Sequence, residues 1–349
     1  KGICLGPSNF IGRAYQQIPI GITVEGANIL TRSLIIFGQG AIRCHPYLLP
    51  EMQAAQNKDV RQGLVDFDKA LWGHVGYTIR NGFRALWLGM TGSHFVGVEA
   101  DVAPEVRRYY QQMTRFSAAF AFLSDISLLV LGGSVKRREK LSARLGDILA
   151  QMYLISCTLK RYEADGRQAA DAPLMHWAVW DAMYKTQEAF DGVIANFPNR
   201  FIGAFLHRSI FPWGHPYVVP SDDLGHQVAK LLIQPSAARD RLTAECYLPL
   251  TESEPVGAIE LALAATLEAE AIEAKIREAE KAGRFTNNPQ ANVRDIAVVA
   301  VECGVITAAE FEKMKRRNML RDIVVHVDDF PFDFNVATAN KPTPERKAA

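Results

Sequence analysis

Hydrophobic residues in this chain recur mainly at helical spacing. From about residue 60 onward, apolar side chains return every three or four positions, which is typical of helices that bury one face. No segment alternates convincingly between polar and apolar residues, as a half-buried strand would. Short connections between successive helices favour a bundle. The sequence therefore predicts an all-α fold.

The most apolar stretch is predicted to be a core helix over about 104–131. Within it, Phe116 to Val130 contains a single charged residue, Asp125, and Arg115 lies immediately before it. A membrane span needs about 20 apolar residues with few charges, and this run is shorter. Burial in the protein core is therefore favoured over a membrane span.

The other predicted segments follow from apolar periodicity and from the positions of Pro and Gly. Pro19 is expected to end a first short helix, and residues 46–58 are expected to form a linker. The tail after Pro331 is polar and contains several prolines, so we expect it to be disordered. Helices are expected at about 9–16, 136–162, 171–197, 252–282, 290–303 and 307–321.

Composition narrows the class of protein. The chain has 349 residues, enough for two domains, and a net charge of +1, which gives no overall field for binding nucleic acid. Its five cysteines are scattered and odd in number, so a reduced cytoplasmic setting is expected. It starts without Met and shows no signal peptide. We therefore expect a fragment of a longer protein.

Glu25 is the one carboxylate in an otherwise uncharged stretch, residues 16–31. Pro19, Gly21 and Gly26 surround it and favour a bent connection before a helix. Two interpretations remain open. Burial without a cationic partner would raise the pKa of this carboxyl group toward neutrality, as a general base requires. Alternatively, Glu25 is a loop glutamate that favours the N-terminus of the next helix through the helix dipole.

Other kinds of chemistry lack the residue patterns they need. The sequence contains no Gly-x-Ser-x-Gly elbow, no phosphate loop ending in Gly-Lys-Ser/Thr and no His-Glu-x-x-His helix. Cys44 and His45 are adjacent metal-binding residue types, but no second ligand pair lies nearby in the sequence. We therefore predict no metal site, which leaves Glu25 as the one candidate catalytic residue.

The segment Phe201 to Val219 mixes aromatic and aliphatic residues with Arg200, His207, Arg208 and His215. This composition suits a helix that lies on a membrane surface with its aromatic side chains at the interface. It equally suits an amphipathic packing segment that ends in a Pro/Gly loop. The basic run 136–140 has a similar pair of interpretations, as a patch for anionic lipid or as a solvated helix start.

Several longer motifs resemble one enzyme family. The chain carries Val24-Glu25-Gly26 followed by Arg32 seven residues after the glutamate. These motifs, and the longer runs 21–33 and 36–47, resemble the acyl-CoA dehydrogenases, specifically the large bacterial FadE-type members. Further similar segments are 131–134, 142–149, 196–200 and 220–222. The resemblance spans most of the chain and is most specific at its front.

The resemblance implies a domain organisation. Residues 1–45 would be the C-terminal end of the catalytic domain's helical bundle, and 46–60 a linker. Residues 61–330 would form an additional C-terminal helical domain, and 331–349 the disordered tail. Roughly the first half of the protein, with most of the flavin pocket, would be missing, so this fragment alone is expected to be inactive.

The resemblance also implies a reaction and its site residues. The family uses FAD to convert medium- and long-chain fatty acyl-CoA to trans-2-enoyl-CoA, the first step of fatty acid β-oxidation. Glu25 would remove the α-proton, and Gly26 would let the acyl chain approach closely because it lacks a Cβ. Ala27, Asn28 and Ile29 occupy the positions at which the family's backbone contacts FAD.

The resemblance also implies binding partners and a cellular location. Electron-transfer flavoprotein is the expected electron acceptor, and a homo-oligomer is expected. The expected location is the bacterial cytoplasm or the cytoplasmic face of the inner membrane, with peripheral membrane contact. The alternative function is a helical interaction module without chemistry of its own, which docks on a membrane or holds a dimer together.

Overall fold

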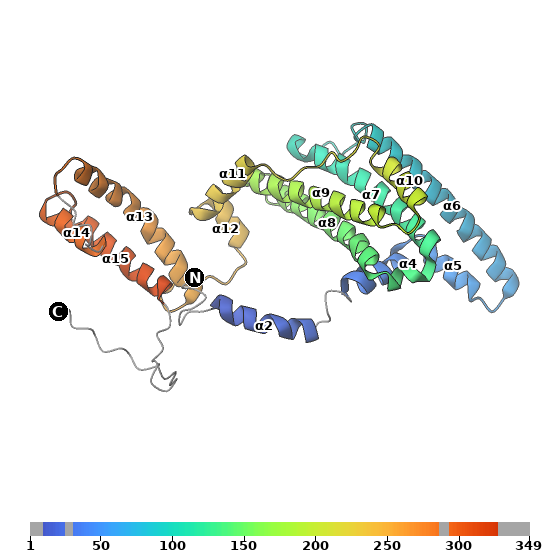
Figure 1. Ribbon diagram of the computed structural model, residues 1–349, viewed down its shortest axis with the longest axis horizontal. Coiled ribbons are helices and arrows are strands. Elements are labelled where there is room, and N and C mark those ends of the chain that lie inside the picture. The colour runs from blue at the N-terminus through green and yellow to red at the C-terminus, as the bar shows by residue number, and fades with distance from the viewer. Residues whose placement is uncertain (1–9, 25–30, 286–292, 327–349) are drawn as a thin grey trace. The chain divides into compact units, whose positions relative to one another are not determined.

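The computed structural model describes residues 10–24, 31–285 and 293–326. Within these ranges the chain forms helices and no strand, which confirms the predicted all-α fold. Figure 1 shows their arrangement. The helices are α2 (Phe10–Val24), η1 (Thr31–Gln39), α4 (Gly40–Cys44), α5 (Leu48–Ala55), α6 (Val60–Met90), α7 (Pro104–Leu131), η2 (Gly132–Arg137), α8 (Glu139–Ala164), η3 (Ala169–Asp171), α9 (Ala172–Ala195), α10 (Arg200–Ile210), α11 (Asp222–Ile233), α12 (Ala237–Thr243), α13 (Pro255–Lys281), α14 (Val293–Glu302) and α15 (Ala308–Val325).

The chain divides into two compact units near residue 238, inside the segment 61–330. The larger unit is 22–238, and the other joins 1–21 with 239–349. The larger unit has its core among α6, α7, α8, α9 and α10, where α8 and α9 run side by side (Figure 1). Large side chains buried there are Phe116, Leu123, Leu145, Ile148, Phe190 and Leu206.

Local sequence signals explain where these helices begin and end. Asp59 caps α6 by accepting hydrogen bonds from the backbone N–H groups of Arg61 and Gln62. Pro104 occupies the first turn of α7, where its missing N–H has no helical partner. Gly132 follows α7 with φ +50°, a left-handed conformation that glycine adopts readily. The predicted helix over 104–131 is thereby confirmed.

In the smaller unit α13 and α15 pack together, with α14 alongside α15. Alanines on α13, among them Ala265 and Ala269, are buried and allow close approach of the two helices. Ile272, Ile276 and Met314 fill the space between them. A capping box starts α15, in which the Thr307 side chain accepts from the Glu310 N–H and the Glu310 side chain accepts from the Thr307 N–H.

Two local expectations were wrong. Helix α5 lies inside the predicted linker, because Pro50 falls within its first turn, where a proline is tolerated. Pro19 lies within α2 and does not end it. The helix that begins at Thr31 takes the wider π form over η1 and continues directly into α4.

Helix α7 and the turn after it form the stretch Pro104–Arg137. Among the described residues, it is the one helix long and apolar enough to cross a membrane. In this structure it packs against α6 and α8, and its Phe116 and Leu123 are buried in the core. It also buries Arg115, which donates to the backbone oxygen of Ile210 at 3.0 Å. These contacts describe a core helix, as the sequence predicts.

Candidate functional site

The predicted catalytic loop falls between two described helices. Glu25, Gly26, Ala27, Asn28 and Ile29 all lie outside the described residues. Helix α2 ends directly before them at Val24, and η1 begins at Thr31. The structure therefore shows how η1, the helix that follows this segment, is attached to the rest of the protein.

Arg32, at the start of η1, is held by helix α8. Its guanidinium donates to both carboxylate oxygens of Asp147, from Nε to Oδ1 and from Nη2 to Oδ2. Asp147 raises the pKa of Arg32, chiefly through this hydrogen bonding. Both side chains are partly exposed, so the ion pair adds little stability. Its main effect is to fix the position of η1 along α8. Arg32 is the residue that keeps the family spacing to Glu25, and it is anchored in the C-terminal helices.

The backbone of η1 also lies directly on α8. A Cβ placed on Gly146 would lie 2.7 Å from the carbonyl oxygen of Arg32, closer than such contacts allow. Phe37, one turn or more further along η1, is buried and meets Phe120 of α7 edge-on with ring centroids 6.3 Å apart. The start of η1 is thus bound to α8 by a side-chain pair and a backbone contact, and its end by core packing.

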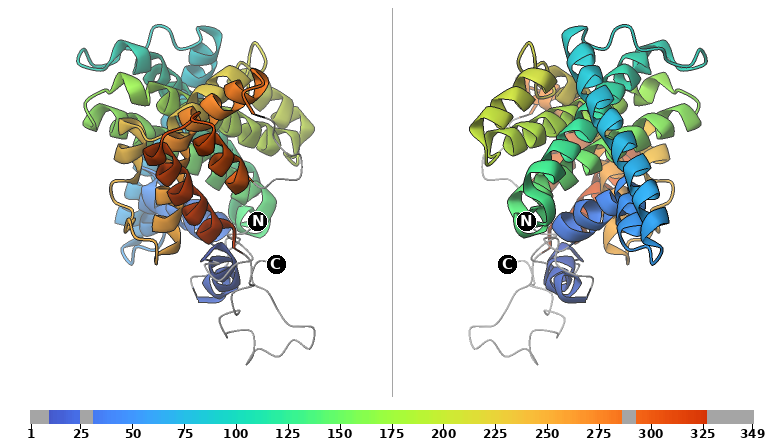
Figure 2. Two further views of the ribbon diagram at one scale, coloured as in Figure 1. Left: turned by 90° about the vertical axis from the view of Figure 1, so that its left-hand side faces the viewer. Right: turned by 90° about the vertical axis from the view of Figure 1, so that its right-hand side faces the viewer.

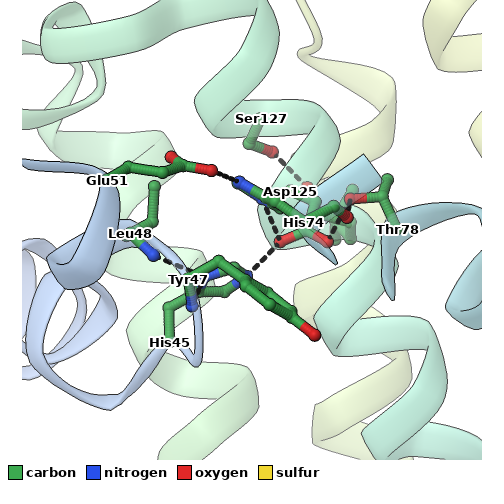
Figure 3. Close-up of polar contacts among 9 residues, drawn as sticks. His45, Tyr47, Leu48, Glu51, His74, Thr78, Asp125 and Ser127 are labelled. Atoms are coloured by element: carbon green, nitrogen blue, oxygen red, sulfur yellow. Dashed lines mark hydrogen bonds and ion pairs between the residues drawn. The ribbon is translucent and has the colours of Figure 1, made fainter. Parts of the chain in front are cut away.

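A buried polar cluster lies where α4 and α5 join the bundle (Figure 3). Its centre is Asp125 of α7, whose side chain is 2% exposed. Asp125 Oδ1 lies 3.0 Å from His45 Nε2, and Asp125 Oδ2 accepts from Thr78 Oγ1 at 2.7 Å. The lone charge of the apolar run Phe116 to Val130 is therefore held by hydrogen bonds from two other segments, as buried charges require.

His74 of α6 extends the cluster toward α5. Its Nδ1 lies 2.8 Å from Glu51 Oε1, and its Nε2 lies 3.8 Å from Asp125 Oδ1. The His45 and His74 rings have centroids 4.5 Å apart, and the Tyr47 ring stacks on His74. Glu51, His74 and Asp125 thus form a chain of polar contacts across three helices (Figure 3).

The hydrogen bonds of His45 indicate which of its two ring nitrogens carries the hydrogen. Its Nδ1 accepts from the backbone N–H groups of Tyr47 and Leu48, each at 3.2 Å. A nitrogen that accepts carries no proton, so Nε2 carries the hydrogen and donates it to Asp125. A metal at Nε2 would have to displace that proton. The cluster is therefore a hydrogen-bonded clamp that joins the start of α5 to α6 and α7.

Local sequence patterns do not predict this clamp, although two of its residues are conspicuous in the sequence. Asp125 is the lone charge in the apolar run, and His45 stands beside Cys44. They are 80 residues apart in sequence, so no spacing rule links them. A buried carboxylate in an apolar helix calls for a polar partner, and that was the available signal.

Comparison with known families now gives the class of protein. The family model for the C-terminal domain of bacterial-type acyl-CoA dehydrogenases matches residues 42–330. This match covers more than half of the chain, so the chain belongs to that family. It includes the clamp, Asp147 and all helices from α5 to α15. No solved structure matches the chain.

Proposed function

We propose that this chain is part of an FAD-dependent acyl-CoA dehydrogenase that oxidises medium- and long-chain fatty acyl-CoA to trans-2-enoyl-CoA. This reaction begins fatty acid β-oxidation, with electron-transfer flavoprotein as the acceptor and a homo-oligomer as the working form. The observation that carries the proposal is the family match from residue 42, continuous with the motif from Glu25 to Arg32. The attachment of Arg32 to Asp147 supports it, because it ties that motif to the matched domain.

One cavity lies beside η1, the helix after the predicted catalytic segment, and can be compared in size with a flavin site. This cavity of about 240 Å³ is lined mostly by apolar side chains, with Lys136 as its one charged residue. Small-molecule pockets are usually about 300–1,000 Å³, so this cavity is too small for a dinucleotide. Contacts to FAD would come from the backbone of Ala27, Asn28 and Ile29 and from parts of the enzyme beyond this chain. We therefore expect this chain alone to be inactive and to retain no flavin.

Glu25 has a defined task in this proposal. The α-proton of a thioester is weakly acidic, so a base must lie against it while charge develops on the thioester oxygen. Hydrogen bonds to that oxygen stabilise the developing enolate, and the backbone N–H of Glu25 would supply one of them. The neighbouring Gly26 would leave room for the acyl chain.

The test is the Glu25→Gln variant of the full-length enzyme. We expect it to keep its flavin, seen in the visible absorbance, and to lose turnover of palmitoyl-CoA, because glutamine cannot accept the proton. Glu51→Gln is a matched control at a glutamate of the clamp, and it should retain turnover. Near-normal turnover by Glu25→Gln would refute the assignment of the base.

A second function, peripheral membrane contact, is favoured by one surface. Helix α10 buries Leu206 and Ile210 in the core, which confirms the packing interpretation for that face. Its other face leaves Phe201 79% exposed, and Trp213 after the helix is 76% exposed. Exposed aromatic residues beside basic ones suit the interface of a membrane.

Helix α6, which packs against α10, continues this surface. Its side chains Trp72, Phe83 and Trp87 are exposed, and the right-hand view of Figure 2 shows the helix on the side that faces the viewer. From Trp72 to Met90 this helix carries two arginines and no carboxylate, and α10 carries two more arginines and no carboxylate. An apolar surface with only positive charge suits an anionic lipid headgroup layer.

Flotation of the chain with vesicles tests this contact. Binding to vesicles with anionic phospholipid should exceed binding to neutral vesicles and weaken with salt, because each basic residue near the surface contributes about 1 kcal/mol. The variant Phe201→Ser/Trp213→Ser should bind less. Tyr247→Ser, at an aromatic residue exposed in the other unit, should bind as before. If the chain binds neither the anionic nor the neutral vesicles, the membrane role is excluded.

A further inference from the structure

A second polar cluster forms where the chain leaves α10 and returns across α9. It contains Asp191 of α9, His207 of the last turn of α10 and His215 in the connection that follows. One carboxylate oxygen of Asp191 and one ring nitrogen from each histidine all lie within 4.8 Å of one another. His215 Nε2 is 2.8 Å from Asp191 Oδ1. The three side chains thus converge on one point from two helices and a loop.

The local fold holds the two imidazoles in place. Phe211 is buried directly after α10, and its ring centroid lies 6.2 Å from that of His207 and 5.1 Å from that of His215. Gly214 has φ +84°, a left-handed conformation that turns the chain back toward α9. The two imidazole planes are nearly perpendicular, at 86°. Their orientation is therefore set by a buried ring and a tight turn.

This cluster differs from the clamp around Asp125 in its hydrogen bonding. In the clamp, both oxygens of Asp125 accept hydrogen bonds, and both nitrogens of His45 have partners: Nδ1 accepts from backbone N–H groups and Nε2 donates to Asp125. In the second cluster, Asp191 Oδ1 is buried and accepts no well-directed hydrogen bond from the described residues, although His215 Nε2 lies nearby. His207 makes ring contacts there and, within the part of the chain that the structure describes, no side-chain hydrogen bond. Asp191 is thus paired with His215 through one oxygen, and the ring of His207 lies beside this pair.

We propose that Asp191, His207 and His215 bind one divalent transition-metal ion, with zinc as the best match. Two imidazoles and a carboxylate are ligands that zinc takes at about 2.0–2.2 Å, and three such protein ligands leave a position for water. The His215 side chain is 45% exposed, so that position opens to solvent. Magnesium and calcium prefer sites made only of oxygen ligands.

Burial raises the pKa of Asp191, and the neighbouring His215 and His207 offset this only in part. A bound divalent ion would favour the carboxylate form.

Zinc binding to the metal-free chain tests the site. All cysteines are alkylated first, because free thiols bind zinc on their own; Cys44, Cys157, Cys246 and Cys303 are exposed among the described residues. We expect one zinc per chain by calorimetry and by metal analysis. Substitution Asp191→Asn, His207→Gln or His215→Gln should weaken binding by about tenfold or more.

Two controls make the outcome decisive. His226→Gln changes an exposed histidine of α11 outside the cluster and should leave zinc affinity unchanged. His215→Gln is the most informative variant, because an exposed loop residue can change without unfolding the chain, and circular dichroism verifies this. The absence of one-to-one zinc binding, or an affinity that none of the three cluster substitutions lowers, would overturn the proposal. The site is independent of the proposed dehydrogenase reaction.

Discussion

Arg32 and Asp147 form a two-point ion pair between the helix after the Glu25 loop and helix α8, across 115 residues of sequence. Gly146, the neighbour of Asp147, lets the Arg32 backbone approach α8 directly. The segment that resembles the end of a catalytic domain is therefore held by the domain that the family model matches. In the proposed enzyme, α8 would fix the position of the helix that follows the catalytic loop.

The coupling between Arg32 and Asp147 should be measurable but small. A double-mutant cycle with Arg32→Ala and Asp147→Ala should give about 0.5–1 kcal/mol of interaction in urea unfolding, since the pair is partly exposed. Salt should reduce this value. A matching cycle on Asp181 and Lys185, an ion pair within α9, should give about 0.3–0.5 kcal/mol. A coupling of zero for Arg32 and Asp147 would show that the contact does not hold η1.

Gly146→Ala should destabilise the larger unit by about 1–3 kcal/mol, because the new methyl group would press on the Arg32 carbonyl. Gly76→Ala is its matched control, since Gly76 also lies inside a long helix but has no atom within 4 Å of the new Cβ. That substitution should stabilise by about 0.5–1 kcal/mol through helix propensity. Equal effects of the two substitutions in urea unfolding would contradict the close packing of η1 on α8.

Asp125→Asn should lower the free energy of unfolding by about 1–3 kcal/mol, because the amide group replaces one acceptor with a donor that faces His45 or Thr78. The exposed Asp68→Asn on α6 should change it by less than about 0.5 kcal/mol. Chemical unfolding of both variants at neutral pH is the measurement. A neutral effect at Asp125 would mean that the clamp does not hold the junction together.

Sequence patterns predicted the helical class, the limits of α7 and the core position of that helix. These features depend on local periodicity and on Pro104 and Gly132, which act within a few residues of their own position. The clamp and the Arg32–Asp147 pair depend on residues 80 and 115 positions apart, which no local pattern connects. Pro19 and Pro50 were misjudged because a proline marks a helix end only when its surroundings do not accommodate it. The role of Glu25 came from motif resemblance, and it stays a prediction.

Glu310 gives the smaller unit a defined response to acid. The Lys275 ammonium and the backbone N–H of Thr307 lower the pKa of Glu310 to about 2, from an ordinary value of 4.5. Because the pKa of Glu310 is lower in the folded state, its contacts with Lys275 and Thr307 stabilise the fold above pH 4.5. That stabilisation is lost as the pH falls toward 2. Carboxyl NMR titration should show the shift directly. Glu310→Gln should remove this part of the acid response in unfolding, whereas Glu312→Gln on the same helix should leave it intact.

Exchange of the hydrogens at C2 of palmitoyl-CoA with solvent deuterium tests the central claim most directly, because it reports removal of the α-proton by itself. The measurement uses the full-length enzyme and its Glu25→Gln variant, without electron acceptor, and with flavin content verified by absorbance. We predict that the wild-type enzyme incorporates deuterium at C2 and that Glu25→Gln, with its flavin still bound, does not. Exchange at the wild-type rate in Glu25→Gln would contradict the assignment of Glu25 as the base.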